Sequence, residues 1–179
     1  MKLTLESLYR DHDNFRRILY LLEQLLIDIC RGSSRDYPLI QHILAYIQDY
    51  PERVHHPRED AILMFIVDNG LSEGKFRGDI NILMRDHSEI EGMTRDTMHA
   101  FERMRINGHP DIPDIGDRLS KLIQRQRAHL LFEEVNIYPH IADHLDDVDW
   151  ETISIVTEHD DPIFGDRVSK EYEQIFKAL

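Results

Sequence analysis

Two short motifs in the chain each place a glutamate four residues after a histidine. The pairs are His55 with Glu59 and His129 with Glu133. Side chains four residues apart lie on the same face of a helix, so each motif points an imidazole and a carboxylate toward one place. Because both groups bind transition metal ions, the spacing predicts a metal site built on helices.

These two motifs lie in different halves of the chain, and the two halves also share a second motif. Arg10-Asp11-His12 recurs 75 residues later as Arg85-Asp86-His87, and the His55 motif recurs 74 residues later as the His129 motif. Nearly equal offsets predict that one pair of helices occurs twice, with a pseudo-two-fold axis between the copies. His12, His87 and the two His-x-x-x-Glu motifs then converge as four imidazoles and two carboxylates.

Six polar side chains are costly to bury in an apolar interior unless a cation binds them. A pair of divalent or trivalent ions fits, with the carboxylates bridging the ions. Mixed nitrogen and oxygen ligands favour iron over calcium or magnesium, which prefer oxygen alone. The candidate metal ligands are therefore His12, His55, Glu59, His87, His129 and Glu133.

His56 competes with His55 for a place in this site, because Pro57 disturbs the local helix and would turn either histidine inward. We favour His55, whose partner four residues on is Glu59, over His56, whose partner is Asp60. The alternative interpretation involves no metal: it is a structural helical bundle in which the histidines only pack against their neighbours. Six histidines lack a repeat-matched carboxylate and are expected at the surface or beside the ligands: His42, His99, His109, His140, His144 and His159.

Several residues next to the candidate ligands have two interpretations. Asp11 and Asp86 each precede a ligand, so they either accept the N–H of a ligand imidazole or face solvent. Asp60 and Glu134 each follow a candidate bridging glutamate and are interpreted as solvated charges. Tyr138, like other large side chains of the helices, is interpreted as a packing residue.

Long helices must position these residues. From Leu5 to Ile29, apolar residues recur every three or four positions, which predicts a helix capped by Thr4 and ended by Gly32. Similar patterns predict three further helices, and no strand pattern appears. Four long helices with short links predict an all-α fold, a four-helix bundle. The three further helices are expected over residues 37–69, 74–107 and 115–145.

Prolines are expected to distort two of these helices. Pro51 and Pro57 should kink or divide the second, and Pro139 should kink the end of the last. A short helix over 149–158, a turn with an aromatic anchor at 161–165 and a last helix from Asp166 are expected to follow. The domain division is then a bundle of residues 1–145 with the dimetal site and a helical extension, 146–179, packed on it.

Composition limits the function classes. The chain has 179 residues, 21 Lys and Arg against 34 Asp and Glu, and a formal net charge of −13. The acidic excess argues against nucleic acids and anionic membranes as partners, which require clustered Lys and Arg. The best apolar run, 61–67, is too short to span a membrane. Cys30 is the only cysteine, which excludes an internal disulfide and fits a cytoplasmic location.

Over roughly residues 5–145, these motifs resemble the hemerythrin-like family of HHE cation-binding domains. The resemblance rests on Asp11-His12, on 55–60 (HHPRED), on Asp86-His87 and on 129–139 (HLLFEEVNIYP). It implies an antiparallel four-helix bundle around a non-haem pair of iron ions, bridged by an oxo or hydroxo group and two carboxylates. Carried over by position, the terminal ligands are His12, His55, His87 and His129, and the bridging ligands are Glu59 and Glu133.

The oxygen-carrying members of this family differ from the chain at two places. Where they have a fifth histidine, four residues after the first one on the third helix, this chain has Glu91. Their last helix uses an aspartate five residues after its histidine, whereas here Glu133 follows at four. Glu91 would join the ligands or lie beside them. The departures argue against reversible oxygen carriage and point toward bacterial members implicated in nitric-oxide or oxidative stress, iron-centre repair, or oxygen and iron sensing.

Two classes of function follow. The first is a protein that binds iron and a small diatomic ligand, oxygen or nitric oxide, for sensing, storage or stress response. The second is a di-iron enzyme that reduces peroxide or nitric oxide, or donates iron to repair damaged iron centres. No nucleic-acid or membrane partner is expected. The sequence does not fix the oligomeric state, and a homodimer is one arrangement that we consider.

Overall fold

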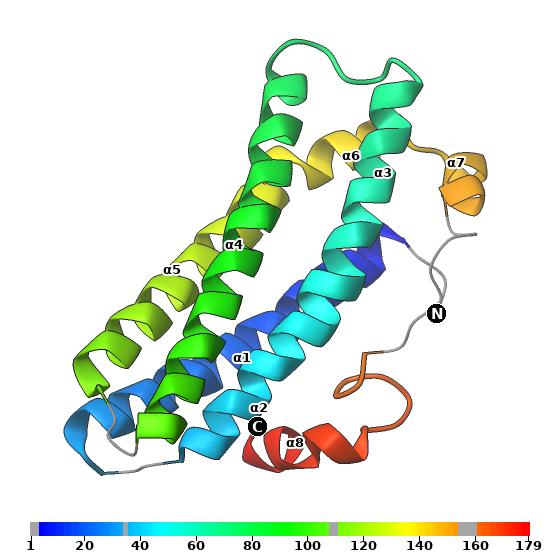
Figure 1. Cartoon of the computed structure of the whole chain (residues 1–179). Coiled ribbons are helices and arrows are strands. Elements are labelled where there is room, and N and C mark those ends of the chain that lie inside the picture. The colour runs from blue at the N-terminus through cyan, green and yellow to red at the C-terminus, as the bar shows by residue number, and fades with distance from the viewer. Residues whose placement is uncertain (1–3, 34–35, 108–110, 154–160) are drawn as a thin grey trace.

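The computed structural model describes residues 4–33, 36–107, 111–153 and 161–179, and these form helices with no strand among them. The all-α fold class expected from the sequence is confirmed. Long helices pack side by side as a bundle, with α5 (Ile112–Asn136) against both α1 (Leu5–Arg31) and α4 (Gly74–Asn107) (Figure 1). His109 and His159 lie outside the described residues.

Helix α1 begins and ends where its sequence signals predict. The Ser7 backbone N–H donates to the Thr4 hydroxyl at 3.1 Å, and the Thr4 backbone N–H donates to the Ser7 hydroxyl at 3.0 Å. Gly32 ends the helix in the left-handed conformation, with φ 70°. A glycine suits this position because it has no Cβ to clash there.

The second long helical segment of the bundle is continuous, but its middle is a π-helix. Helix α2 (Tyr37–Ile47) leads into η1 (Gln48–His55), which leads into α3 (His56–Asp68). Pro51 lies inside η1, has no N–H to donate and would clash with the preceding turn of an α-helix. The distortion expected here therefore takes the form of a widened turn, a feature often found at functional sites.

The remaining elements follow the bundle. A single turn residue, Ile137, separates α5 from α6 (Tyr138–His144), next to the position where Pro139 predicted a distortion. Among the described residues that follow, there are three short elements: α7 (Asp147–Ile153), the 3-10 helix η3 (Lys170–Tyr172) and α8 (Glu173–Ala178). Helix α8, red in Figure 1, lies against α2. None of the described helices has both the length and the apolar character that a membrane span needs.

The expectation of a last helix from Asp166 is wrong. Residues 162–167 form turns instead, closed by the Gly165 N–H, which donates to the Asp161 carbonyl at 2.8 Å. The Ser169 N–H donates to the Pro162 carbonyl at 2.7 Å and closes a wider loop. The Ser169 N–H would be the first donor of a helix from Asp166, so this bond competes with that helix, and helical structure begins only at Lys170.

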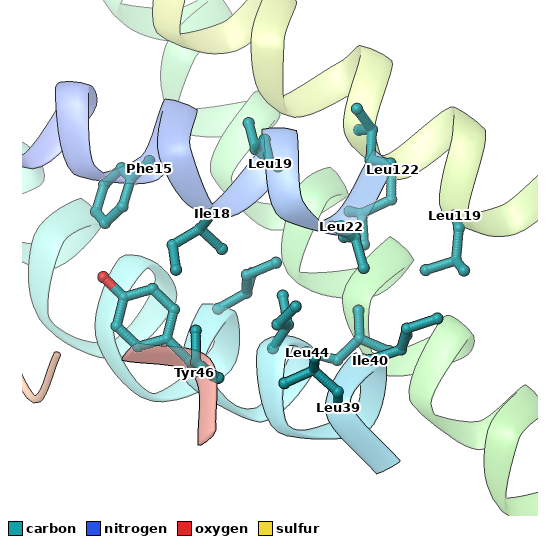
Figure 2. Packing of buried hydrophobic residues seen from close by; sticks show 14 of the residues in the cluster. Phe15, Ile18, Leu19, Leu22, Leu39, Ile40, Leu44, Tyr46, Leu119 and Leu122 are labelled. Carbon is teal, nitrogen blue, oxygen red and sulfur yellow. The ribbon is translucent and has the colours of Figure 1, made fainter. Parts of the chain in front are cut away.

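The apolar side chains of the described residues form two clusters, one toward each end of the bundle. Figure 2 shows part of the larger cluster, where side chains of α1 such as Leu22 meet Leu44 of α2 and Leu122 of α5. The smaller cluster includes Leu8 and Ile62. On α1, Leu8 belongs to the smaller cluster and Phe15 to the larger, with His12 between them. His12 and the other buried histidines thus occupy a polar layer between the two apolar clusters.

The C-terminal segment is anchored on the bundle by a buried hydrogen bond. The Tyr46 hydroxyl of α2 donates to Asp161 Oδ2 at 2.9 Å. Ile163, Tyr172 and Ile175 are buried in the larger apolar cluster. Phe164 lies under the guanidinium of Arg17, 4.8 Å from its ring centre.

Replacing Tyr46 with phenylalanine should destabilise the fold. The substitution leaves Asp161 Oδ2 buried without its donor, which costs about 1–3 kcal/mol. Urea unfolding measures the loss. Tyr20→Phe is the control, because Tyr20 is 61% exposed and should change stability little. Equal stability of Tyr46→Phe and the unsubstituted protein would show that this bond does not hold the segment.

Candidate metal centre

The structure brings the six candidate ligands together in the polar layer. They come from four helices of the bundle, α1, α3, α4 and α5, and from the end of η1. His56 joins them as a seventh member. All seven residues are buried, with at most 7% of their surface exposed: His12, His55, His56, Glu59, His87, His129 and Glu133.

The histidines form two groups. His12 and His55 share one group with Glu59, and their donor atoms lie within 4.8 Å of one another. His56, His87 and His129 form the other group within the same distance. In the second group the rings of His56 and His87 stack, with centres 4.2 Å apart.

Glu59 and Glu133 lie between the two groups, and each carboxylate faces both. Glu59 Oε1 is 3.4 Å from His55 Nε2, and its Oε2 is 3.6 Å from His87 Nε2. Glu133 Oε2 is 3.2 Å from His12 Nε2, and its Oε1 is 3.2 Å from His129 Nε2. Each carboxylate therefore offers one oxygen to each group, which is the arrangement of a bridging ligand.

Several atoms that point into the layer have no hydrogen-bond partner. They include Nε2 of His55 and His129, and Oε2 of Glu59 and Glu133. A buried polar atom without a partner costs about 1–3 kcal/mol, so four at one place would be a large penalty. Lone pairs from imidazole nitrogens and carboxylate oxygens are what a transition metal ion binds. The donor set therefore fits metal ions.

Four carboxylates surround the layer, and each faces the outer nitrogen of a histidine on a different element. His12 Nδ1 donates to Glu134 Oε1 at 2.9 Å, and His87 Nδ1 donates to Asp60 Oδ1 at 3.0 Å. This bond fixes the ring and leaves Nε2 free to face the centre, as is usual for metal-binding histidines. The interpretation of Asp60 and Glu134 as solvated charges is incomplete, because these side chains are 37% and 20% exposed but also hydrogen-bond to a histidine.

The other two outer carboxylates are the aspartates of the Asp-His motifs. His55 Nδ1 donates to Asp11 Oδ2 at 3.1 Å, and His129 Nδ1 faces Asp86 Oδ2 at 3.8 Å. Of the two interpretations open for these aspartates, the contact with an imidazole is the one seen. Each aspartate contacts a histidine on another element, and not the histidine that follows it in the sequence.

These four contacts follow the internal repeat. The Asp11–His55 pair corresponds to Asp86–His129 at the offsets of 75 and 74 found in the sequence. The Asp60–His87 pair corresponds in the same way to Glu134–His12. A pseudo-two-fold axis therefore relates the surroundings of the two groups, as the repeat predicted.

Two residues near the site behave differently from the expectations. Glu91 is not among the converging side chains: it is 55% exposed and pairs with Arg95 at 3.4 Å. The choice between His55 and His56 does not arise, because both are buried on the layer. A π-turn rotates the chain less per residue than an α-turn, which explains how two adjacent histidines both face inward.

Tyr138 is the functional candidate that the sequence reasoning missed. Its ring packs in the core as expected, but its hydroxyl lies 2.7 Å from His12 Nε2 and donates to Glu59 Oε1 at 2.5 Å. The position of Tyr138 directly after the break at Ile137, five residues after Glu133, is the only signal in the chain that points to it.

Comparison with known proteins agrees with this geometry. The family model of the hemerythrin HHE cation-binding domain matches residues 3–141, most of the chain. The chain belongs to the hemerythrin HHE family. Searches of curated proteins and of solved structures found no match. As a hemerythrin HHE domain, the chain binds metal cations, and the layer of buried histidines and glutamates is the part of the described structure that suits this role.

Without metal, two histidines of the hemerythrin HHE site hold protons strongly. Burial lowers the pKa of His55, but Glu59 and Asp11 outweigh it and raise the pKa to about 10. Burial likewise opposes the change at His87, where Asp60 and Glu133 raise the pKa to about 9. A metal ion must displace these protons, so binding should strengthen as the pH rises.

The metal-free protein should therefore lose stability in alkaline solution. A histidine with a raised pKa in the folded state stabilises the fold fully below its unfolded pKa of about 6.5, and this contribution disappears as the pH passes about 9–10. Between about pH 6.5 and pH 10, urea unfolding of chelator-treated protein should show a decrease of several kcal/mol in the free energy of unfolding. The metal-loaded protein is the control and should lack the decrease. A flat profile of the metal-free protein would contradict the two pKa values.

Proposed function

We propose that this hemerythrin HHE domain holds two iron ions in a non-haem di-iron centre. We further propose that the centre binds a small diatomic ligand, oxygen or nitric oxide, for sensing, storage or a stress response. The observation that carries the proposal is the placement of Glu59 and Glu133, each with one oxygen toward each histidine group. A single ion would use one such group and leave the atoms of the other without partners.

The proposed ligands of the two ions follow from the groups. One ion takes His12 and His55, the other takes His87 and His129 with His56, and both share Glu59 and Glu133. Five imidazoles and two carboxylates suit a borderline transition metal better than calcium or magnesium. Iron, when bound, would supply one-electron redox chemistry and coordination positions for a small ligand. We propose that residues 1–145 form this metal-holding unit and residues 146–179 its extension.

The surroundings of the layer favour a small ligand over a large one. The ligand side chains lie between two apolar clusters, which exclude bulk water from the centre. A cavity of about 460 Å³ lies beside α1, where Asp11 and Tyr50 line it. Asp11 also accepts the hydrogen bond of His55, so the cavity ends one side chain away from the layer. A diatomic molecule is small enough to pass such a barrier during side-chain motion.

Metal content tests the di-iron proposal. The full chain purified from iron-replete cells should carry two iron ions, with near-ultraviolet absorption typical of an oxygen-bridged ferric pair. The double variant His129→Ala with Glu133→Ala should bind less than one, because it removes a carboxylate that faces both groups. The control is His99→Ala with Glu102→Ala, an exposed pair on α4 that should keep both ions. Full iron content in the first double variant would sink the proposal.

Ligand binding is tested separately, on the ferrous protein without air. Oxygen or nitric oxide should change its absorption spectrum, and removing the gas under vacuum should restore the spectrum if the protein binds without turning over. Consumption of peroxide or nitric oxide over many catalytic cycles would instead show that the domain is an enzyme. A spectrum that neither gas changes would contradict the ligand-binding part of the proposal.

A further inference from the structure

The hydroxyl of Tyr138 occupies a place among the donor atoms of the first histidine group. Tyr138 is fully buried, with its ring stacked on that of His12 at 5.0 Å and edge-on to Tyr9 at 4.9 Å. These contacts leave the ring one orientation, in which the hydroxyl points at His12 Nε2 and Glu59 Oε1. Both atoms are proposed ligand atoms of the same ion.

The distances suit a further ligand of that ion. Bonds from transition metals to nitrogen or oxygen are about 2.0–2.2 Å long, so two neighbouring ligand atoms at right angles lie about 3 Å apart. The Tyr138 oxygen lies 2.7 Å from His12 Nε2 and 2.5 Å from Glu59 Oε1, close to that separation. When the Nδ1–H of a neutral His12 donates to Glu134, His12 Nε2 is an acceptor, as Glu59 Oε1 is, and one hydroxyl proton serves only one of these two acceptors. A metal ion between the three atoms would bind a lone pair of each.

The internal repeat supports the same assignment independently. At the offset of 74, the counterpart of His56 is Leu130 and the counterpart of Tyr138 is Met64. Each half of the chain therefore departs from the repeat by one added donor. His56 joins the group of His87 and His129, while Tyr138 joins the smaller group. With both departures, each group offers three side chains of its own besides the two shared carboxylates.

We propose that Tyr138 is a metal ligand, bound as a phenolate to the ion that His12 and His55 hold. The inference rests on the proposed di-iron centre and names a ligand within it. Coordination replaces the O–H bond with an oxygen–metal bond, and the proton leaves to solvent. The phenolate adds a negative charge to one ion only, which favours the ferric state there. Each ion then has five protein donors, so a small ligand binds between the ions or displaces the phenolate.

The spectrum of the ferric protein tests this assignment. A phenolate bound to ferric iron gives a visible charge-transfer band, and Raman scattering excited in that band shows tyrosinate ring vibrations. We expect both signals in the unsubstituted protein and in Tyr46→Phe, the control for a buried tyrosine that donates to a carboxylate elsewhere. Tyr138→Phe should lose both signals while it keeps two iron ions and the near-ultraviolet bands.

Three results would overturn the assignment. They are two ferric ions in the unsubstituted protein without a visible band, a band without tyrosinate vibrations, and a band that persists in Tyr138→Phe. The first two need no variant, so they decide the question even if Tyr138→Phe fails to fold. If the chain takes up no iron, the di-iron proposal fails by itself. Titration with Ga³⁺ then tests the tyrosine: tyrosinate difference absorption that Tyr138→Phe lacks supports the assignment, and its absence in the unsubstituted protein overturns it.

Discussion

Polar atoms without hydrogen-bond partners, enclosed in an apolar interior, are the constraint around which this bundle is built. Nε2 of His129 and Oε2 of Glu133 point into a layer that the two apolar clusters seal on either side. Such atoms can be stabilised by protons or by cations, and the raised pKa of His55 shows the proton alternative in the metal-free state. The helices, their register and the outer carboxylates all keep these atoms converging, so the geometry of the site depends on the fold.

The sequence was sufficient for the features that local spacing determines. The four-residue spacing of His55 and Glu59 put both on one helical face, and the repeat offsets predicted how the helices pair. Thr4 and Gly32 marked the ends of α1 because their capping contacts are made within a few residues. The bundle and the convergence of the six candidate side chains therefore followed from period and repetition. Their role as metal ligands remains a prediction, as does the division of the chain at residue 145.

What the sequence did not reveal depends on contacts between distant elements. Asp60 and Glu134 look like surface charges in the sequence, because only packing of α3 on α4 and of α5 on α1 brings them to His87 and His12. The π-helix that buries His55 and His56 together is a response of the bundle to Pro51, which could equally have broken the helix. Tyr138 follows the break between α5 and α6 at Ile137, so the helical spacing of α5 does not predict that its hydroxyl reaches the layer.

The outer contacts also describe how the two halves of the chain depend on each other. Two of them stay within a half, whereas Asp60–His87 and Glu134–His12 cross from one half to the other. Two identical helix pairs, associating as separate molecules about a two-fold axis, would form all four. In such an assembly any change in sequence would appear in both histidine groups. Joining the halves in one chain removes that restriction, so that one histidine group gains the imidazole of His56 and the other gains the phenol of Tyr138.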